Sequence, residues 1–157
     1  MILSQLDYNN GLLIGSPKYV IKRLQKTLNK AVRFIYDVKW KEHITPYLHK
    51  LHVLPVKYRI KYKACLIAYK VTRQMAPSYL INNMNLYKRQ SGPVLRYASG
   101  RDELTFDCNL AAHKSNNIID NVMLEWNMLP FALRNSKDLQ NFETGLKTRY
   151  FKEAFEC

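Results

Sequence analysis

Residues 18–36 read KYVIKRLQKTLNKAVRFIY, and two side-chain patterns in this stretch decide the fold class. Its apolar residues recur at steps of three and four and therefore share one helical face: Ile21, Leu24, Leu28, Ala31, Val32 and Ile35. Basic residues recur at the same steps in another phase and form a second stripe: Lys22, Lys26, Lys30 and Arg33. The stretch predicts an amphipathic helix with one apolar face for a core and one basic face.

Helical periodicity continues on both sides of this stretch. We expect short helices at 4–13, at 45–51 and from about 76, and longer ones at 56–73, 118–129 and 136–155. Pro46 and Pro55 stand where a proline opens a helix. Residues 57–63 also alternate in character, which is a strand signal, but the helical period runs on through Arg73 without a turn residue. We therefore predict a helix there too.

Residues 88–117 interrupt the periodicity with turn-forming residues such as Ser91-Gly92-Pro93 and Ser99-Gly100. Within them, Leu104-Thr105-Phe106 is a candidate short strand. The expected fold is mainly α: a single helical domain over 1–157, with six to seven helices and one irregular excursion at 88–117. Trp126 should be buried and should anchor the last two helices.

Charge is concentrated in one third of the chain. The 157 residues carry 25 Lys and Arg against 12 Asp and Glu, a formal net charge of +13. Residues 18–73 hold 15 of these cations but only Asp37 and Glu42, so this segment alone accounts for the excess. Such a concentration favours a surface that faces a polyanion. The longest apolar run within a periodic segment, 64–69, is too short for a bilayer, so no membrane partner is expected.

Residue patterns for catalysis and for metal binding are sparse. No two aspartates are adjacent, so the carboxylate pair of a two-metal polymerase site is missing, and no glycine-rich phosphate loop is present. His43, His49 and His52 lie close in sequence, but Cys65 is the nearest thiol and no Cys-x-x-Cys pair accompanies them. We therefore expect no enzyme activity, no metal and no cofactor. The three scattered cysteines suit a reducing compartment.

Nucleic acid, whether RNA, DNA or a hybrid, is the partner that the basic residues predict. The candidate phosphate-binding residues lie on the two longest basic segments: Lys22, Arg23, Lys26, Lys30, Arg33, Lys57, Arg59, Lys61, Lys63, Lys70 and Arg73. Tyrosines interleave with the second group, and each either stacks on a base or fills a core: Tyr58, Tyr62 and Tyr69.

A series of short motifs runs through the chain in a fixed order. Residues 6–13, LDYNNGLL, resemble the "LDYCNSLL" segment of non-LTR (LINE-type) retrotransposon reverse transcriptases of the Jockey and chicken-repeat lineages. Residues 43–55 are similar to that family's "HITPLL..LHWLP", and 76–80 to its "APEYL". Residues 126–130 resemble "WNSLP" and 151–155 resemble "LFKEAF". The series spans about 4–155, although 88–117 follows it poorly.

The resemblance implies a part of such a polymerase and not the whole enzyme. In these elements the fingers and palm, with their aspartates, precede the matching segment, so the chain resembles the helical thumb and C-terminal part that grips template and primer. We therefore expect a non-catalytic nucleic-acid-binding fragment, found in the cytoplasm, the nucleus or both. The alternative is a helical protein-interaction module, or an inert translated transposon remnant, with no nucleic-acid role.

Overall fold

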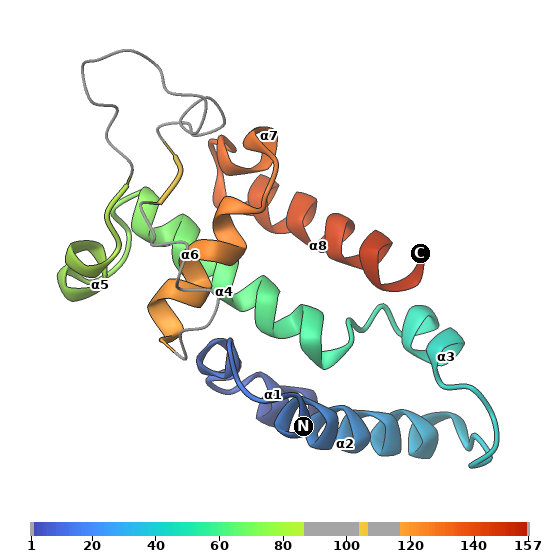
Figure 1. The fold of residues 1–157 in the computed structure, drawn as a ribbon. Helices are drawn as coiled ribbons and strands as arrows, with labels where there is room; N and C mark the ends of the chain where they lie inside the picture. Colours follow the sequence, from blue (N-terminus) through green and yellow to red (C-terminus); the bar gives the residue numbers. More distant parts are fainter. Residues whose placement is uncertain (1, 87–103, 107–116, 157) are drawn as a thin grey trace, which may run out of the picture.

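A computed structural model describes residues 2–86, 104–106 and 117–156 (Figure 1). The prediction of a mainly helical fold is confirmed: the only pairing of β type among these described residues is an antiparallel bridge between Leu86 and Phe106. The helical elements, in chain order, are α1 (Ile2–Asp7), the 3-10 helix η1 (Asn10–Leu13), α2 (Lys18–Tyr36), α3 (Thr45–Lys50), α4 (Val56–Thr72), α5 (Ser78–Asn83), α6 (Ile118–Asn127), α7 (Phe131–Arg134) and α8 (Leu139–Phe155).

Helix α4 lies at the centre of the molecule. It packs against η1, α2, α5, α6 and α8, and Figure 1 shows α2 along one side of it and α8 along the other. The stretch 57–63 is therefore helical, as the continuing 3.6-residue period predicts, and does not form a strand. Because neighbours surround α4, its buried residues occupy most of its circumference: Val56, Ile60, Ala64, Cys65, Ala68, Tyr69 and Val71.

Trp126 of α6 anchors one contiguous core, as the sequence predicts. Its side chain is 0% exposed, and its indole ring lies within 5.7 Å of the Phe142 ring and 6.5 Å of the Tyr69 ring, measured between centroids. The indole N–H donates to the Leu104 carbonyl at 2.7 Å, so burial leaves no unpaired donor. Trp126 therefore joins α4, α6 and α8, and fixes residue 104 beside them.

Residues 104–106 are held by a side chain of α6. The Phe106 amide donates to Oδ1 of Asn127 at 2.9 Å, and Nδ2 of Asn127 donates back to the Phe106 carbonyl at 2.9 Å. The Asn127 amide thus pairs with the Phe106 backbone as a neighbouring strand would. The candidate strand at 104–106 is reduced to the bridge with Leu86, and the other residues of the expected excursion, 88–103 and 107–116, lie outside the described part.

Three sequence-based expectations need correction. The helix expected over 4–13 is broken at Asn9, whose φ of 50° lies in the left-handed region that asparagine tolerates, so α1 and η1 are separate. The last helix, expected from residue 136, begins at Leu139 behind Asp138. Ile35, assigned to the core stripe of α2, is 63% exposed because that stripe contacts the core mainly through Leu28 and Val32.

In the part of the chain that the structure describes, no helix combines the length and the apolar character needed to cross a bilayer.

Candidate nucleic-acid interface

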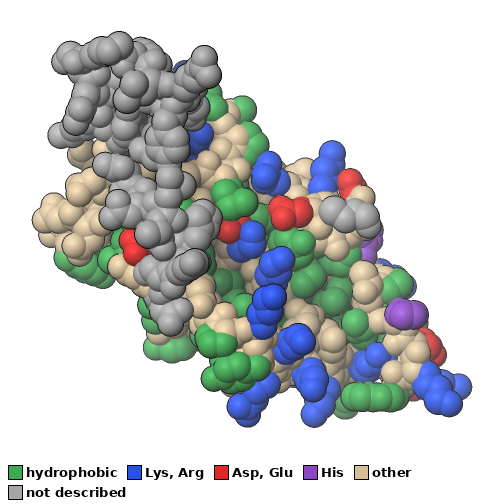
Figure 2. Space-filling view, in the orientation of Figure 1, with side chains coloured by type: hydrophobic (Ala, Val, Ile, Leu, Met, Phe, Trp, Pro, Cys, Tyr) green, Lys and Arg blue, Asp and Glu red, His purple; other side chains and the backbone are tan. Residues whose placement is uncertain are grey.

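The basic stripe of α2 faces solvent. Lys22, Lys26 and Lys30 are exposed, whereas Leu28 and Val32, on the opposite side of the helix, are buried against the core. At the helical rise of 1.5 Å per residue, the three ammonium-bearing positions span about 12 Å. Among the described residues none of the three forms a salt bridge with a carboxylate. Figure 2 shows Lys and Arg side chains gathered over the region where α2 lies.

A polar contact fixes this stripe relative to the centre of the molecule. The side-chain carbonyl of Gln25 accepts a hydrogen bond from the Val56 amide, the first residue of α4, at 2.8 Å. The Gln25 side-chain amide donates to Oδ1 of Asn29 at 2.8 Å, which sets its orientation. Because the first amides of a helix have no partner within the helix, Gln25 supplies one from α2. The cations of α2 are thereby displayed from a helix with a defined position.

Arg23 and Arg33 differ in their surroundings although both lie on α2. Arg23 is exposed, like the lysines of the stripe. Arg33 is half-buried: its guanidinium donates to the Lys39 carbonyl and to the Glu42 carbonyl, the latter at 2.7 Å, and lies 5.5 Å from the centre of the Trp40 ring. Arg33, predicted as a phosphate-binding residue, therefore holds the turn that follows α2.

Two of the predicted cations in the second basic segment are used for packing. Arg59 forms a two-pronged salt bridge with Asp7 of α1, and its side chain is only 16% exposed. Arg73, just after α4, donates to the Ser136 carbonyl at 2.8 Å and lies 5.6 Å from the centre of the Tyr69 ring. These two guanidinium groups join distant parts of the chain, so their donors are directed inward.

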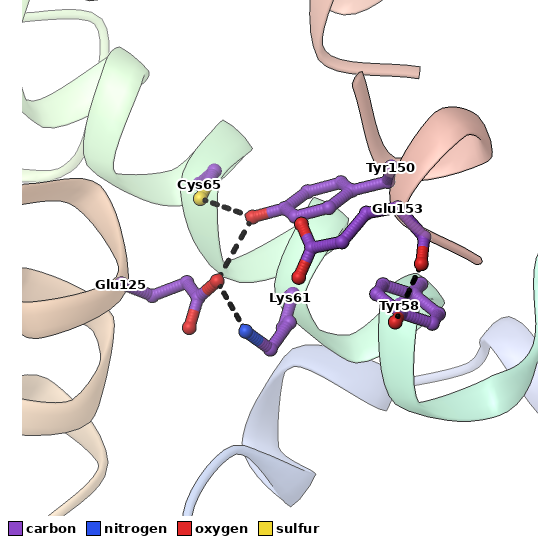
Figure 3. A network of polar contacts seen from close by, with 6 residues as sticks. All are labelled: Tyr58, Lys61, Cys65, Glu125, Tyr150 and Glu153. Carbon is purple, nitrogen blue, oxygen red and sulfur yellow. Dashed lines mark hydrogen bonds and ion pairs between the residues drawn. The ribbon is translucent and has the colours of Figure 1, made fainter. Parts of the chain in front are cut away.

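A third cation of this segment, Lys61, belongs to a polar network between α4, α6 and α8 (Figure 3). Its ammonium donates to Oε1 of Glu125 at 2.8 Å, and the Tyr150 hydroxyl donates to the same oxygen at 3.1 Å. The Sγ atom of Cys65 lies 3.3 Å from the Tyr150 hydroxyl. Since that hydroxyl gives its proton to the carboxylate, the thiol is the donor to Tyr150. Each hydrogen bond of the network then has a defined donor and acceptor.

Burial determines the protonation states in this network. Removal of the Cys65 thiol from water raises its pKa to about 12, and the same effect raises the pKa of Tyr150 well above its usual value. The thiol is therefore neutral at physiological pH and is not a nucleophile. The cluster stabilises the packing of three helices and offers no reactive group.

The remaining cations of α4 are more accessible. Lys57 and Lys70 are exposed, and Lys63 is half-buried. The ammonium group of Lys57 lies 5.5 Å from the centre of the Tyr58 ring. None of these three lysines forms a salt bridge within the described residues. They are therefore available to phosphates, although they do not form a stripe like that of α2.

The three candidate stacking tyrosines lie against the protein itself. Tyr69 is 1% exposed, its ring stacks on Phe142 at 4.5 Å, and its hydroxyl donates to the Ser136 and Lys137 carbonyls. The Tyr58 hydroxyl donates to the backbone carbonyl of Glu153 at 3.1 Å. Tyr62 is half-buried, and burial raises its pKa. Of the two interpretations open from the sequence, core packing is the one that describes Tyr69.

Sequence reasoning missed a different set of aromatic residues. Tyr19 is 66% exposed, Phe34 is 88% exposed and Trp40 is 79% exposed, and all three lie on α2 or in the turn after it. The helical wheel contained the signal, because Tyr19 falls among the basic residues and Phe34 falls outside the apolar stripe.

The histidines near α3 make aromatic contacts. The ring of His49 lies 5.2 Å from Phe151 and 5.3 Å from Phe155, and the ring of His52 lies 5.7 Å from Phe151, so both pack on α8. No group of three or more metal-ligating side chains occurs within residues 2–86, 104–106 and 117–156.

Comparisons with known proteins found no match for this chain among protein-family models, curated proteins or solved structures.

Proposed function

We propose that this chain is a non-catalytic nucleic-acid-binding part of a retrotransposon-type reverse transcriptase, which grips the sugar–phosphate backbone through the basic face of α2. Two independent features support the proposal. One is the ordered series of motifs along residues 4–155 that resembles the region after the palm in non-LTR elements. The other is the distribution of cations on α2.

The observation that carries the proposal is the exposed stripe of Lys22, Lys26 and Lys30. The helix contains no acidic residue that would neutralise it, and its opposite face is buried. Cations held in a row on a rigid helix neutralise successive phosphates and release the counterions condensed on them. Such contacts fix position and carry little sequence information, which suits a protein that holds any template.

The non-catalytic part of the proposal rests on the sequence. The chain lacks the adjacent aspartate pair that holds the two metal ions in a two-metal polymerase site. It would take part in RNA-directed DNA synthesis only within a longer polypeptide that contributes a palm.

The decisive experiment measures how salt weakens binding. We expect the triple variant Lys22→Gln, Lys26→Gln, Lys30→Gln to bind an RNA–DNA hybrid more weakly than the wild type at about 50 mM salt. Each lost phosphate contact lowers the slope of log affinity against log salt by about 0.7–0.9, so the slope should flatten by about 2–3 units. Fluorescence anisotropy of a labelled hybrid between about 50 and 200 mM salt provides both quantities. Arg33 stays unchanged because it holds the turn after α2.

A matched control removes three charges elsewhere. Lys137, Lys147 and Lys152 are also exposed, and they lie on or next to α8, on the other side of α4 from α2 (Figure 1). Their replacement by glutamine should leave the slope close to that of the wild type. If both triple variants behave alike, net charge alone governs binding and α2 is not the interface. A shallow slope in the wild type itself would favour the protein-interaction alternative.

A further inference from the structure

The solvent-facing side of α2 carries aromatic rings as well as cations. Three aromatic side chains, Tyr19, Phe34 and Trp40, are each about two thirds exposed or more. The core rings of Tyr69, Phe142 and Trp126 are almost fully buried. Exposed aromatic side chains lose the hydrophobic stabilisation that burial provides. Three of them beside one basic stripe therefore form a surface that is suited to a planar, apolar group on a polyanion.

The rings lie at the two ends of the stripe. Tyr19 precedes Lys22 by less than one helical turn, and Phe34 follows Lys30 by about one turn. The helical rise separates Tyr19 from Phe34 by about 22 Å. One strand of a duplex advances about 3.4 Å per nucleotide, so the two rings bracket a segment of several nucleotides.

Trp40 is held beside the end of the stripe by Arg33. The guanidinium of Arg33 donates to the carbonyls of Lys39 and Glu42, on either side of Trp40, and lies over its indole ring at 5.5 Å. The amide of Glu42 also donates to the Lys39 carbonyl at 3.1 Å, which closes the turn. The ring is therefore positioned by the fold although 79% of the side chain is exposed.

We propose that this surface binds single-stranded nucleic acid in preference to a duplex, with unpaired bases stacking on Phe34, Trp40 and Tyr19 while the lysines contact phosphates. The inference rests on the proposed function and adds the strand type to it. Bases within a duplex already stack on one another, so their faces are not available to a protein ring, whereas each base of a single strand presents a π-face. Charge complementarity identifies the occupant as a polyanion, since α2 carries six cations and no acid.

An anionic lipid surface is the competing occupant, because lysines with Trp and Phe also suit a membrane interface. The distribution on α2 favours nucleic acid. A helix that lies in a bilayer interface presents its apolar face to the lipid, but the apolar face of α2 contacts the protein core through Leu28 and Val32. The exposed rings instead stand among or beside the cations.

The test separates base stacking from charge. Three probes are compared on the full-length chain: a thymidine oligonucleotide, an abasic oligonucleotide with the same number of phosphates, and a duplex. We expect the thymidine strand to bind about 5- to 100-fold more tightly than the abasic strand, as one or two stacked bases would produce. Binding should also quench the fluorescence of exposed Trp40, while the emission of buried Trp126 stays unchanged.

The matched variants are Phe34→Ala with Trp40→Ala on one hand, and the three stripe lysines replaced by glutamine on the other. The aromatic double variant should lose most of the preference for the thymidine strand over the abasic strand, because only Tyr19 remains to stack, but it should keep its affinity for the abasic strand and its salt slope. That retained affinity also reports that the variant is folded. The lysine variant should weaken binding to all three probes.

The other possible results distinguish failure of the base-stacking inference from failure of the proposed function. Equal binding of the three probes with a steep salt slope would overturn base stacking and leave the proposed function standing. No binding to any probe would overturn both. Tighter binding to phosphatidylserine vesicles than to the thymidine strand, lost in the aromatic variant, would assign the surface to a membrane and overturn the inference.

Discussion

Helices α2 and α4 have similar compositions but differ in how many of their cations pair with an acid. Each contains five or more Lys and Arg and no acidic residue. Helix α2 buries one face, so Lys22, Lys26 and Lys30 remain in water, whereas α4 is packed by η1, α2, α5, α6 and α8. A basic residue on α4 therefore either extends into solvent, as Lys70 does, or pairs with an acid from another element. The number of packed faces, and not the content of cations, determines which helix offers a charged surface.

The test with the largest expected effect on stability replaces one tyrosine on each helix. Tyr69→Ala should lower the free energy of unfolding by about 3–5 kcal/mol, because it removes the stacked contact with Phe142 and leaves a cavity. Tyr19→Ala, on the exposed side of α2, should change it by less than about 0.5 kcal/mol. Urea unfolding followed by circular dichroism measures both.

Tyr69→Phe sharpens the result. It keeps the ring and removes only the hydroxyl that donates to the Ser136 and Lys137 carbonyls, so it should cost about 1 kcal/mol. If Tyr69→Ala and Tyr19→Ala lower the free energy of unfolding equally, the two tyrosines do not differ in burial, and the comparison of α4 with α2 is wrong.

The second test compares two lysines. Lys61→Met keeps the length of the side chain but leaves the Glu125 carboxylate without its cation, and the two side chains are only 22% and 14% exposed. Loss of a hydrogen bond to a charged group in such a site should cost about 1.5–3 kcal/mol. Lys26→Met removes a solvated charge and should cost less than about 0.5 kcal/mol.

Adding Glu125→Gln to Lys61→Met provides the control. The neutral amide needs no counter-charge and still offers an oxygen to Tyr150, so part of the lost stability should return. A double variant less stable than Lys61→Met alone would show that the carboxylate stabilises the fold without Lys61.

The difference between the two helices also explains what the sequence could predict. The one-sided pattern of α2 is local, so its boundaries at Lys18 and Tyr36 and its exposed basic stripe follow from the periodicity. The partners of the α4 cations are 52 residues away for Arg59 and 64 residues away for Lys61. No spacing rule connects positions so far apart, so the sequence alone predicts Arg59 and Lys61 as phosphate-binding residues and does not indicate their acidic partners.

Local sequence also left two aromatic residues undecided. The tyrosines between lysines on α4 were open to base stacking or to core packing, and Tyr69 is a core residue because its face of the helix is covered by α8. Trp40 lies in a turn without helical or strand periodicity, so the pattern gave no basis for placing it beside the stripe. Its position depends on Arg33, which the sequence predicts as a ligand for phosphate.

The last expected effect concerns pH and the buried Cys65 of α4. Burial raises the pKa of the Cys65 thiol to about 12, while an unfolded thiol titrates near about 8.5. Between these values the unfolded chain releases a proton that the native chain retains, so stability falls as pH rises, and below about pH 8.5 the thiol contributes no pH dependence.

The Cys65 thiol should therefore lower the free energy of unfolding by about 1.4 kcal/mol for each pH unit above about pH 8.5. Cys65→Ala lacks this proton and shares every other titrating group with the wild type, so the difference between their urea-unfolding curves from about pH 8.5 to pH 11 isolates it. The wild type should lose stability more steeply. If the stability of both proteins depends on pH in the same way, the pKa of Cys65 is the same in the folded and the unfolded chain. The environment of Cys65 on α4 would then be as accessible to water as the exposed face of α2.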